Sequence, residues 1–190
     1  MSIRTSHQIT DNTWFITFTC YDWLPLFEIT DSYDLIYNWL KLIDGKYQIK
    51  TLAYVIMPNH AHVLIYLTEL NINLNTLLSN GKRFMAYEFI KWLKASNQNS
   101  LLDKLSAGCS EKEKAKGQKH KVFEPSFDAK EIYSVGFLNQ KIDYIHNNPV
   151  QGKWNLAKEY TDYPHSSAAF YIDGALNEYV EITDYRIYWV

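Results

Sequence analysis

Alternating apolar and polar positions predict the strands of this chain. The stretch NTWFITFTCY sets aromatic and aliphatic residues against threonines at every second position, which is typical of a strand with one buried face. Two further apolar runs flank Pro58-Asn59, a dipeptide suited to a tight turn, and therefore predict a hairpin. The strands expected from these patterns span residues 12–21, 47–57, 60–67 and 127–133.

Three other segments repeat their apolar residues at helical spacing and predict amphipathic helices. We expect the first helix to end at Gly45, the second to be interrupted at Gly81, and the third to end at Pro149, which cannot continue a helix. These helices are expected over residues 31–44, 73–95 and 134–148.

The order strand–helix–strand–strand–helix–strand predicts an α+β fold, an antiparallel sheet of ferredoxin-like (RRM-like) order with helices packed on one side. The chain has 190 residues, the length of one ordinary domain, and no linker or internal repeat divides it. We therefore expect a single domain over 1–190. Within it we expect a polar, mobile insertion at about 96–120, with one short helix near 101–105, and an irregular aromatic tail from about 151.

Composition narrows the classes of protein that fit. Only two cysteines occur, without paired spacing, which disfavours a disulfide framework or a thiolate metal site and favours a reducing cytoplasm. The sequence shows neither a membrane-length apolar run nor a signal-peptide pattern, so we expect a cytoplasmic protein without a membrane partner. The net charge of −2 argues mildly against binding to nucleic-acid phosphates, although residues 81–94 and 111–121 are locally basic.

Two histidines within the hairpin are the first candidate for chemistry. His60 and His62 alternate along a strand, so their side chains share a face and lie roughly 6.6–7 Å apart along it. Two imidazoles at this separation can bind one cation. Two solvated surface histidines are an equally good interpretation of the motif alone, so a metal site needs a third donor from elsewhere in the chain.

The last predicted helix offers such a donor beside a possible nucleophile. Tyr144 lies off the apolar stripe of this helix, on a face that it shares with Lys141 and, one turn later, Asn148. The amide oxygen of Asn148 suits a hard cation such as Mg²⁺ or Mn²⁺, and a cation held there would lie within reach of the Tyr144 hydroxyl. An ordinary surface tyrosine remains the alternative.

Three motifs together resemble a known family. MPNHAH is followed about eighty residues later by DYIHNNPV and then by YPHSSAAFY. In this order and at this spacing the motifs resemble the single-tyrosine HUH transposases, and most of all the REP-associated tyrosine transposases of bacteria, from about Gln8 to Tyr171. The insertion is longer and the charge less basic than the family pattern leads us to expect.

The resemblance implies an HUH nuclease fold and a site. His60 and His62 match the histidine–hydrophobic–histidine motif, Tyr144 matches the nucleophile, and Asn148 matches the third ligand of Mg²⁺ or Mn²⁺. The implied activity is that of a transposase, a metal-dependent endonuclease and strand transferase that cleaves and rejoins single-stranded DNA through a 5′-phosphotyrosine. Hairpin or repeat sequences are the expected substrate, and both a monomer and a homodimer fit.

Several basic and proton-carrying side chains are candidates around this site. We expect DNA contacts from Lys82, Arg83 and Lys141, and less strongly from other lysines of the long helix. His146 is two positions from Tyr144 and therefore points elsewhere on the helix, so we interpret it as a bystander rather than a proton carrier.

Two other functions fit parts of the same pattern. A non-cleaving protein derived from such a transposase would bind a DNA hairpin, although binding alone does not require the histidines, the tyrosine and the asparagine together. A metal-dependent hydrolase of small phosphate esters would use His120 or His165 as its third ligand and would form no covalent adduct.

Overall fold

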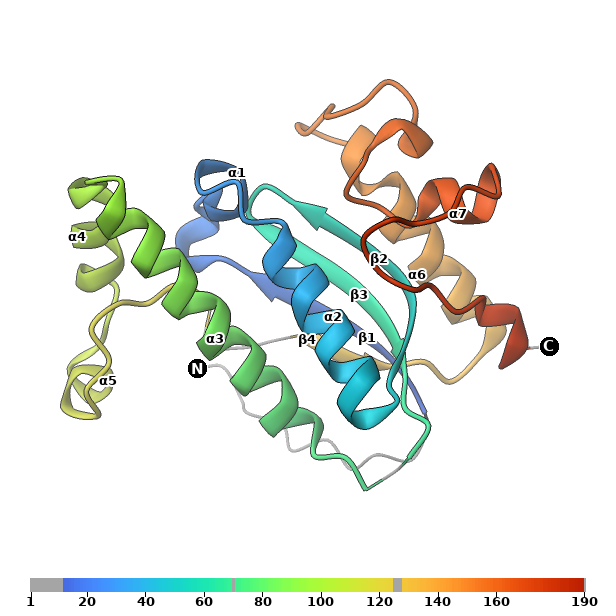
Figure 1. Ribbon diagram of the computed structural model, residues 1–190, viewed down its shortest axis with the longest axis horizontal. Coiled ribbons are helices and arrows are strands. Elements are labelled where there is room, and N and C mark those ends of the chain that lie inside the picture. The colour runs from blue at the N-terminus through green and yellow to red at the C-terminus, as the bar shows by residue number, and fades with distance from the viewer. Residues whose placement is uncertain (1–11, 70, 125–127, 190) are drawn as a thin grey trace.

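A four-stranded antiparallel sheet forms the centre of the molecule (Figure 1). The computed structural model describes residues 12–69, 71–124 and 128–189. The strand order is β2-β3-β1-β4, which is the ferredoxin-like order expected from the sequence. The strands are β1 (Thr13–Thr19), β2 (Lys50–Met57), β3 (His60–Tyr66) and β4 (Asp128–Glu131).

The predicted hairpin places the two histidines in the middle of this sheet. Pro58 and Asn59 join β2 to β3, and β3 pairs with β1 on its other side. In this register His60 is opposite Thr19 and His62 is opposite Thr17. Because β3 is flanked on both sides, its side-chain directions are fixed by two ladders of hydrogen bonds.

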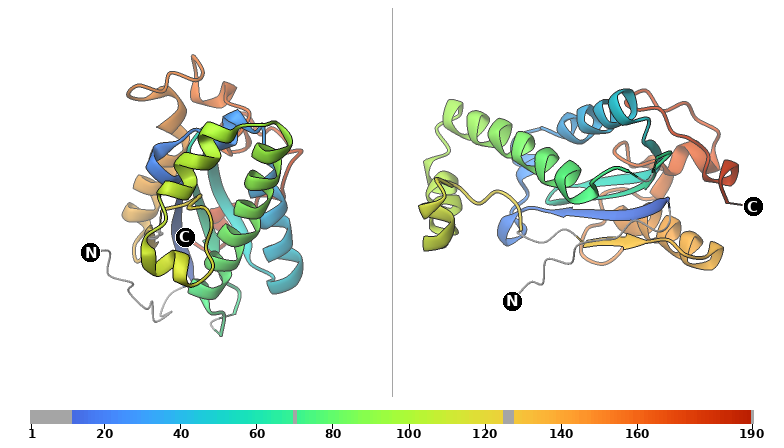
Figure 2. Two further views of the ribbon diagram at one scale, coloured as in Figure 1. Left: turned by 90° about the vertical axis from the view of Figure 1, so that its left-hand side faces the viewer. Right: turned by 90° about the horizontal axis from the view of Figure 1, so that it is seen from below.

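Two long helices cover one face of the sheet, α2 (Asp34–Tyr47) and α3 (Leu74–Ala95). Figure 2 shows both on the same side of the strands. The expected stop at Gly45 is wrong, because α2 continues to Tyr47 and ends where Gln48 adopts a left-handed conformation (φ 55°). The expected interruption at Gly81 is also wrong: α3 is continuous there, and a Cβ on Gly81 would lie 2.6 Å from Trp39 Nε1. Glycine at this position permits the close approach of the two helices.

The opposite face of the sheet carries α6 (Val135–Asn147) (Figure 2). The expectation that helices pack on one side only is therefore wrong. Along the strands, every second residue faces α2 and α3. The residues between them face the other way, and the apolar stripe of α6 packs against these. This second core includes Phe15, Val55, Leu64, Leu138, Ile142 and Ile145.

The polar insertion forms two helices, α4 (Asn99–Ala107) and α5 (Glu111–Ala115), where we expected a mobile segment with one short helix. Leu105 and Cys109 are buried, so a few apolar side chains fasten a lysine- and glutamate-rich surface to the domain. Ser110 begins α5 with a capping box, in which its side chain and that of Glu113 exchange hydrogen bonds with each other's backbone. Local capping and sparse burial thus order a segment whose average composition is polar.

The aromatic tail lies along the outer edge of β2. The amide of Ile56 donates to the His165 carbonyl at 2.8 Å, and the amide of Ser167 donates to the Tyr54 carbonyl at 2.9 Å. These bonds cover an edge that would otherwise expose unpaired backbone groups. The short helices here and near the N-terminal strand are η1 (Tyr21–Trp23), α1 (Leu26–Ile29), η2 (Asn148–Val150), η3 (Tyr160–Asp162), α7 (Ala168–Ile172) and η4 (Tyr185–Ile187). Among the described residues, no helix has the length and apolar character needed to cross a bilayer.

Candidate active site

His60 lies on the face of the sheet that α6 covers, and only 4% of it is exposed. Its Nδ1–H donates to Asn59 Oδ1 at 2.7 Å, which selects the tautomer with a free electron pair on Nε2. Burial lowers the pKa of His60 to about 4; a hydrogen bond to Asn148 opposes this shift and the charge of Lys153 adds to it. The imidazole is therefore neutral at neutral pH and can act as a metal ligand.

His62 lies beside His60, with the two ring centroids 4.8 Å apart. Its Nδ1 is 2.9 Å from the Thr17 hydroxyl on the neighbouring strand. Its Nε2 is buried and has no hydrogen-bond partner among the described residues. Burial, with the charges of His60 and Lys141, holds the pKa of His62 well below its usual value. A buried polar nitrogen without a partner costs about 1–3 kcal/mol, so this atom indicates a ligand-binding position.

Tyr144 of α6 lies against His62 in the same chain. The ring centroids of these two residues are 4.9 Å apart, and Phe15 lies 6.1 Å from Tyr144. Tyr144 is 46% exposed, so part of this residue can be reached by a substrate. Lys141, one turn earlier, places its Nζ 4.6 Å from the centre of the Phe15 ring and 5.7 Å from that of Tyr144.

Asn148 completes the candidate site at the point where α6 ends. It is largely buried, and its side chain lies close enough to His60 to raise the pKa of that ring. The fold thus brings two neutral imidazoles and one amide together, and this donor set fits a divalent ion. Across the described ranges, no three His, Cys, Asp or Glu side chains gather in this way, so a site of this kind depends on Asn148.

Among the described histidines, His146 and His165 have hydrogen-bond partners outside this pair. His165 stacks on Tyr33 at 3.8 Å and its Nδ1 is 2.9 Å from the Tyr37 hydroxyl. His146 is buried and its Nε2 is 3.0 Å from Ser167 Oγ, which favours the interpretation of a bystander.

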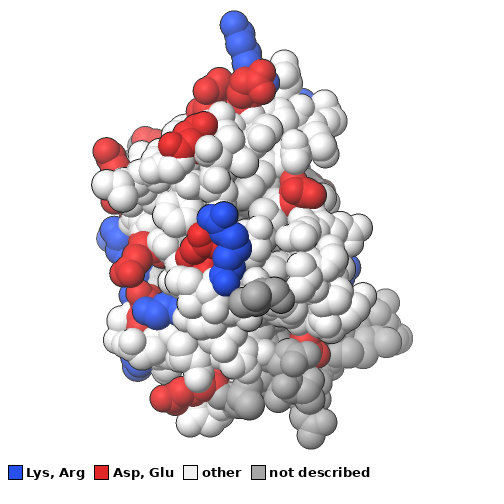
Figure 3. All heavy atoms as spheres, turned by 90° about the vertical axis from the view of Figure 1, so that its right-hand side faces the viewer, with Lys and Arg blue, Asp and Glu red and all other residues white. Residues whose placement is uncertain are grey.

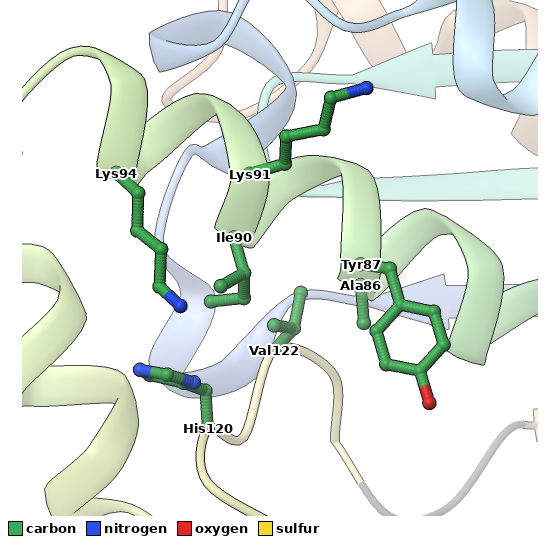
Figure 4. A pocket seen from close by; sticks show the side chains of 7 residues that line it. All are labelled: Ala86, Tyr87, Ile90, Lys91, Lys94, His120 and Val122. Atoms are coloured by element: carbon green, nitrogen blue, oxygen red, sulfur yellow. The ribbon is translucent and has the colours of Figure 1, made fainter.

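His120 lines a hollow of about 520 Å³ against α3, together with Tyr87 and Lys94 (Figure 4). This hollow is on the side of the sheet opposite the histidine pair, because α3 packs on that other face. Neither His120 nor His165 is therefore positioned as a third ligand of a small-molecule phosphoesterase.

The three lysine and arginine residues singled out for DNA contact lie in different places. Lys141 is beside Tyr144, whereas Lys82 and Arg83 are on α3 and do not line the site. Lys82 Nζ donates to the Glu124 carbonyl at 3.0 Å, and burial lowers the pKa of Lys82 to about 8. Arg83 is exposed beside the Phe84 ring. The role of all three in DNA binding stays a prediction, and only Lys141 has the position for contact at the candidate site.

Sequence patterns missed four residues that surround the pair: Thr17, Trp23, Asn59 and Trp154. Trp23 and Trp154 lie 5.7 and 6.0 Å from the His60 ring. From the sequence, Asn59 was identified only as a turn residue, and Thr17 only as one of the polar residues that alternate with apolar ones along a predicted strand. The alternation of β1 contained one signal that could have been used. Thr17 lies on the α6 face of β1, directly opposite His62 of β3.

Charge is mixed on the side of the molecule at the right of Figure 1. Lysine and arginine alternate there with aspartate and glutamate, and the described atoms form no continuous basic surface (Figure 3). The face seen in this view therefore offers no general basic field for a phosphate backbone.

Comparison with known proteins supports the fold. No protein-family model and no curated protein matches the chain. The solved structure of a REP-associated tyrosine transposase bound to a REP hairpin matches with a TM-score of 0.63 and 20% identity, over 97% of this chain and 94% of that one. A candidate transposase from Deinococcus radiodurans R1 matches with a TM-score of 0.34 and 15% identity, over 77% and 97%, which is too weak to bear on the fold. The chain therefore has the fold of the REP-associated tyrosine transposase, as its resemblance to the single-tyrosine HUH transposases predicts.

Proposed function

We propose that the protein is a transposase, a single-stranded DNA endonuclease and strand transferase of the single-tyrosine HUH type. The observation that carries the proposal is the contact between Tyr144 and His62, which come from segments about eighty residues apart. A partly exposed tyrosine beside two neutral imidazoles and an amide is suited to nucleophilic attack on a phosphodiester.

His60, His62 and Asn148 are the residues that would hold Mg²⁺ or Mn²⁺ in this protein. A divalent ion there would neutralise charge on the scissile phosphate and orient it. Asn59 and Thr17 hold the two imidazole rings in place from behind, through hydrogen bonds to Nδ1 of each ring. Such supporting partners fix the ring orientation and the tautomer of histidine ligands.

Tyr144 supplies the attacking atom. Its phenolic oxygen forms a bond to phosphorus, the bond from phosphorus to the 3′ oxygen breaks, and the phenolic proton leaves to solvent. The products are a 5′-phosphotyrosine and a free 3′-hydroxyl. Attack by a 3′-hydroxyl on the same phosphorus reverses the step and joins strands, so phosphodiester energy is conserved in the adduct.

The DNA substrate we propose is a single strand that forms a hairpin. The solved transposase with the same fold is bound to a REP hairpin. In this chain, Lys141 brings a positive charge beside Tyr144, where a phosphate would have to approach. We propose that one chain supplies the whole active site, because Tyr144 lies against His62 of the same chain.

Covalent adduct formation tests the proposal. End-labelled hairpin oligonucleotides with randomised single-stranded flanks are incubated with the protein and Mn²⁺ and then separated on a denaturing gel. We expect a shifted band whose peptide carries the nucleotide on Tyr144 by mass spectrometry, and which Tyr144→Phe abolishes. Tyr87→Phe, at a tyrosine of α3 that is 62% exposed, is the matched control and should leave the band unchanged.

Two results would contradict the proposal. A band that persists in Tyr144→Phe would assign the nucleophile elsewhere. Tight binding of hairpins without any band, at every flank sequence in the pool, would support the non-cleaving hairpin-binding protein instead.

A further inference from the structure

We propose that an aromatic row through the site is a track for an unpaired strand, with Trp23 and Tyr133 stacking bases on either side of the scissile phosphate. The proposal rests on the function proposed above and adds to it the residues that select single-stranded over duplex DNA. It concerns side chains outside the metal ligands and the nucleophile.

The row is continuous from one side of the site to the other. Starting from Trp23, the ring of His60 is 5.7 Å away, His62 follows at 4.8 Å, and Tyr144 follows at 4.9 Å. Phe15 lies 5.3 Å from His62 and continues the row toward α6. These residues come from η1, β3, β1 and α6, so the row is a product of tertiary structure.

The second end of the row is formed by Tyr133 and Phe137, at the start of α6. Their rings are stacked with centroids 4.9 Å apart, and Lys141 Nζ lies over both Phe137 and Phe15, at 5.2 and 4.6 Å. Tyr133 is 72% exposed, so its outer face is open to a base. Near His60, Lys153 lies over the ring of Trp154, so a lysine and an aromatic ring are paired on this side of the site as well.

Trp23 is held in a position that core packing does not explain. The tryptophan is 58% exposed, and both it and Asp22 adopt left-handed backbone conformations, with φ of 54° and 52°. Residues with a Cβ seldom adopt this conformation, so other contacts must hold it. The side-chain amide of Asn59 donates to the Trp23 carbonyl at 2.9 Å and accepts from His60 on its other side.

That amide connects the platform to the metal-ligand histidine. Asp22 adds an ion pair to Lys104 at 2.7 Å, and its backbone amide donates to Glu124 at 3.0 Å. A large exposed ring, on a backbone that these contacts hold beside a candidate ligand, is suited to stacking a flat partner. The flat partner that a phosphodiester site presents is a nucleobase.

The length and chemistry of the row fit an extended single strand. Its ends lie beyond the two termini of β1, which spans roughly 20 Å at about 3.3 Å per residue. Sequence-tolerant single-strand binders combine aromatic platforms with cations in this way, because every base has a face for stacking. Paired and stacked bases in a duplex stem do not offer that face, so the track favours the unpaired flank of a hairpin.

A base-by-base coupling experiment tests the track. Tyr144→Phe protein without metal is mixed with a fluorescent hairpin that carries single-stranded flanks, and affinity is measured by anisotropy. A series of the same hairpin has one abasic site at each flank position in turn. Introducing Trp23→Ala into this Tyr144→Phe protein should weaken its binding of the intact hairpin by roughly five- to a hundred-fold, which is the usual effect of losing one stacked base.

The decisive result is coupling between one ring and one base, which means that their losses do not add. In the Tyr144→Phe parent, an abasic site at one flank position should weaken binding as much as the Trp23→Ala substitution does. When Trp23→Ala is already present, an abasic site at that position should weaken binding no further. Tyr133→Ala should show this pattern at a different flank position. Trp23→Phe should restore most of the affinity, which separates stacking from damage to the fold.

Phe84→Ala is the matched control, because Phe84 is 62% exposed on α3 but lies on the other side of the sheet. Equal affinities for the parent, Trp23→Ala and Tyr133→Ala would overturn the track, as would equal losses at every abasic position in every variant. The two proposals can fail independently. If a covalent adduct forms but no ring–base coupling is seen, only the track is contradicted. If coupling is seen but no adduct forms, only the nuclease activity is contradicted. A protein that binds no hairpin removes both.

Discussion

Asn59 has more structural roles at the residue scale than its place in a tight turn suggests. Its amide oxygen accepts from His60 Nδ1, and its amide nitrogen donates to the Trp23 carbonyl. The first bond sets the histidine tautomer and the second restrains a left-handed backbone. One buried side chain therefore controls both the proposed metal ligand and the proposed stacking platform.

Asn59→Ala should weaken Mn²⁺ binding by roughly 10- to 100-fold, because His60 loses the partner that holds its tautomer and orientation. Isothermal titration with Mn²⁺ measures the change. Asn139→Ala, at an exposed position of α6, is the control and should bind as the parent does. Unchanged affinity in Asn59→Ala would show that His60 is not a ligand or that its orientation is fixed by other contacts.

Two elements, α3 and the tail, show how tertiary position changes what a polar side chain does. Lys82 of α3, which we expect to contact DNA, lies near the rings of Phe18 and Phe123 and donates to a carbonyl. Ser167 lies in the tail yet is fully buried, where its hydroxyl bonds to the Tyr54 backbone and to His146. It thereby joins the tail to β2 and α6.

The buried amine of Lys82 should produce a pH-dependent stability. Its pKa in the folded state is about 8, below the unfolded value of 10.5. Between these values the unfolded state binds more protons, so the stability of the parent should rise with pH relative to Lys82→Met, by on the order of 2 kcal/mol. Urea unfolding at pH 7, 9 and 10 measures this difference, and a difference independent of pH would show that the amine is solvated.

Ser167→Ala should lower the free energy of unfolding by about 1–3 kcal/mol, because the backbone amide of Tyr54 and the ring nitrogen of His146 lose a buried partner. Urea unfolding again provides the measurement. Ser79→Ala, at an exposed serine of α3, should change stability by less than about 0.5 kcal/mol. Equal effects of the two substitutions would mean that the tail does not clamp β2.

At the scale of the whole molecule, the sheet separates a structural side from a candidate active side. Helices α2 and α3 cover one face and enclose the larger core, while α6 covers the other and brings Tyr144 and Asn148 to the histidines. All four residues come together within one chain, and we propose that the site is assembled in cis.

Assembly in cis predicts that two inactive variants cannot rescue each other. The experiment refolds the Tyr144→Phe and His62→Gln variants together in equal amounts. This mixture should form no covalent adduct with hairpin DNA. The control is Tyr144→Phe mixed with unmodified protein, which should give the adduct in proportion to the unmodified chain. An adduct in the mixture of variants would show that the tyrosine of one chain acts with the histidines of another.

The sequence by itself determined the direction of each side chain relative to its own element. Period-two alternation put His60 and His62 on one face of a strand, and helical spacing put Tyr144 off the stripe that packs α6. These inferences are reliable because they depend on neighbours a few residues away. The strand order also followed from the sequence of elements and the short hairpin turn.

Tertiary structure alone decided which of these elements meet. Gly45 continues α2 at an exposed position, Gly81 continues α3 because its lack of a Cβ allows the close approach of Trp39, and the polar insertion is helical because a few buried side chains fasten it. The burial of Lys82, the double role of Asn59 and the distance from Tyr144 to His62 depend on contacts between segments far apart in the chain. Local periodicity carries no information about such distances, because it predicts the direction of a side chain on its own element but not which other element that side chain meets.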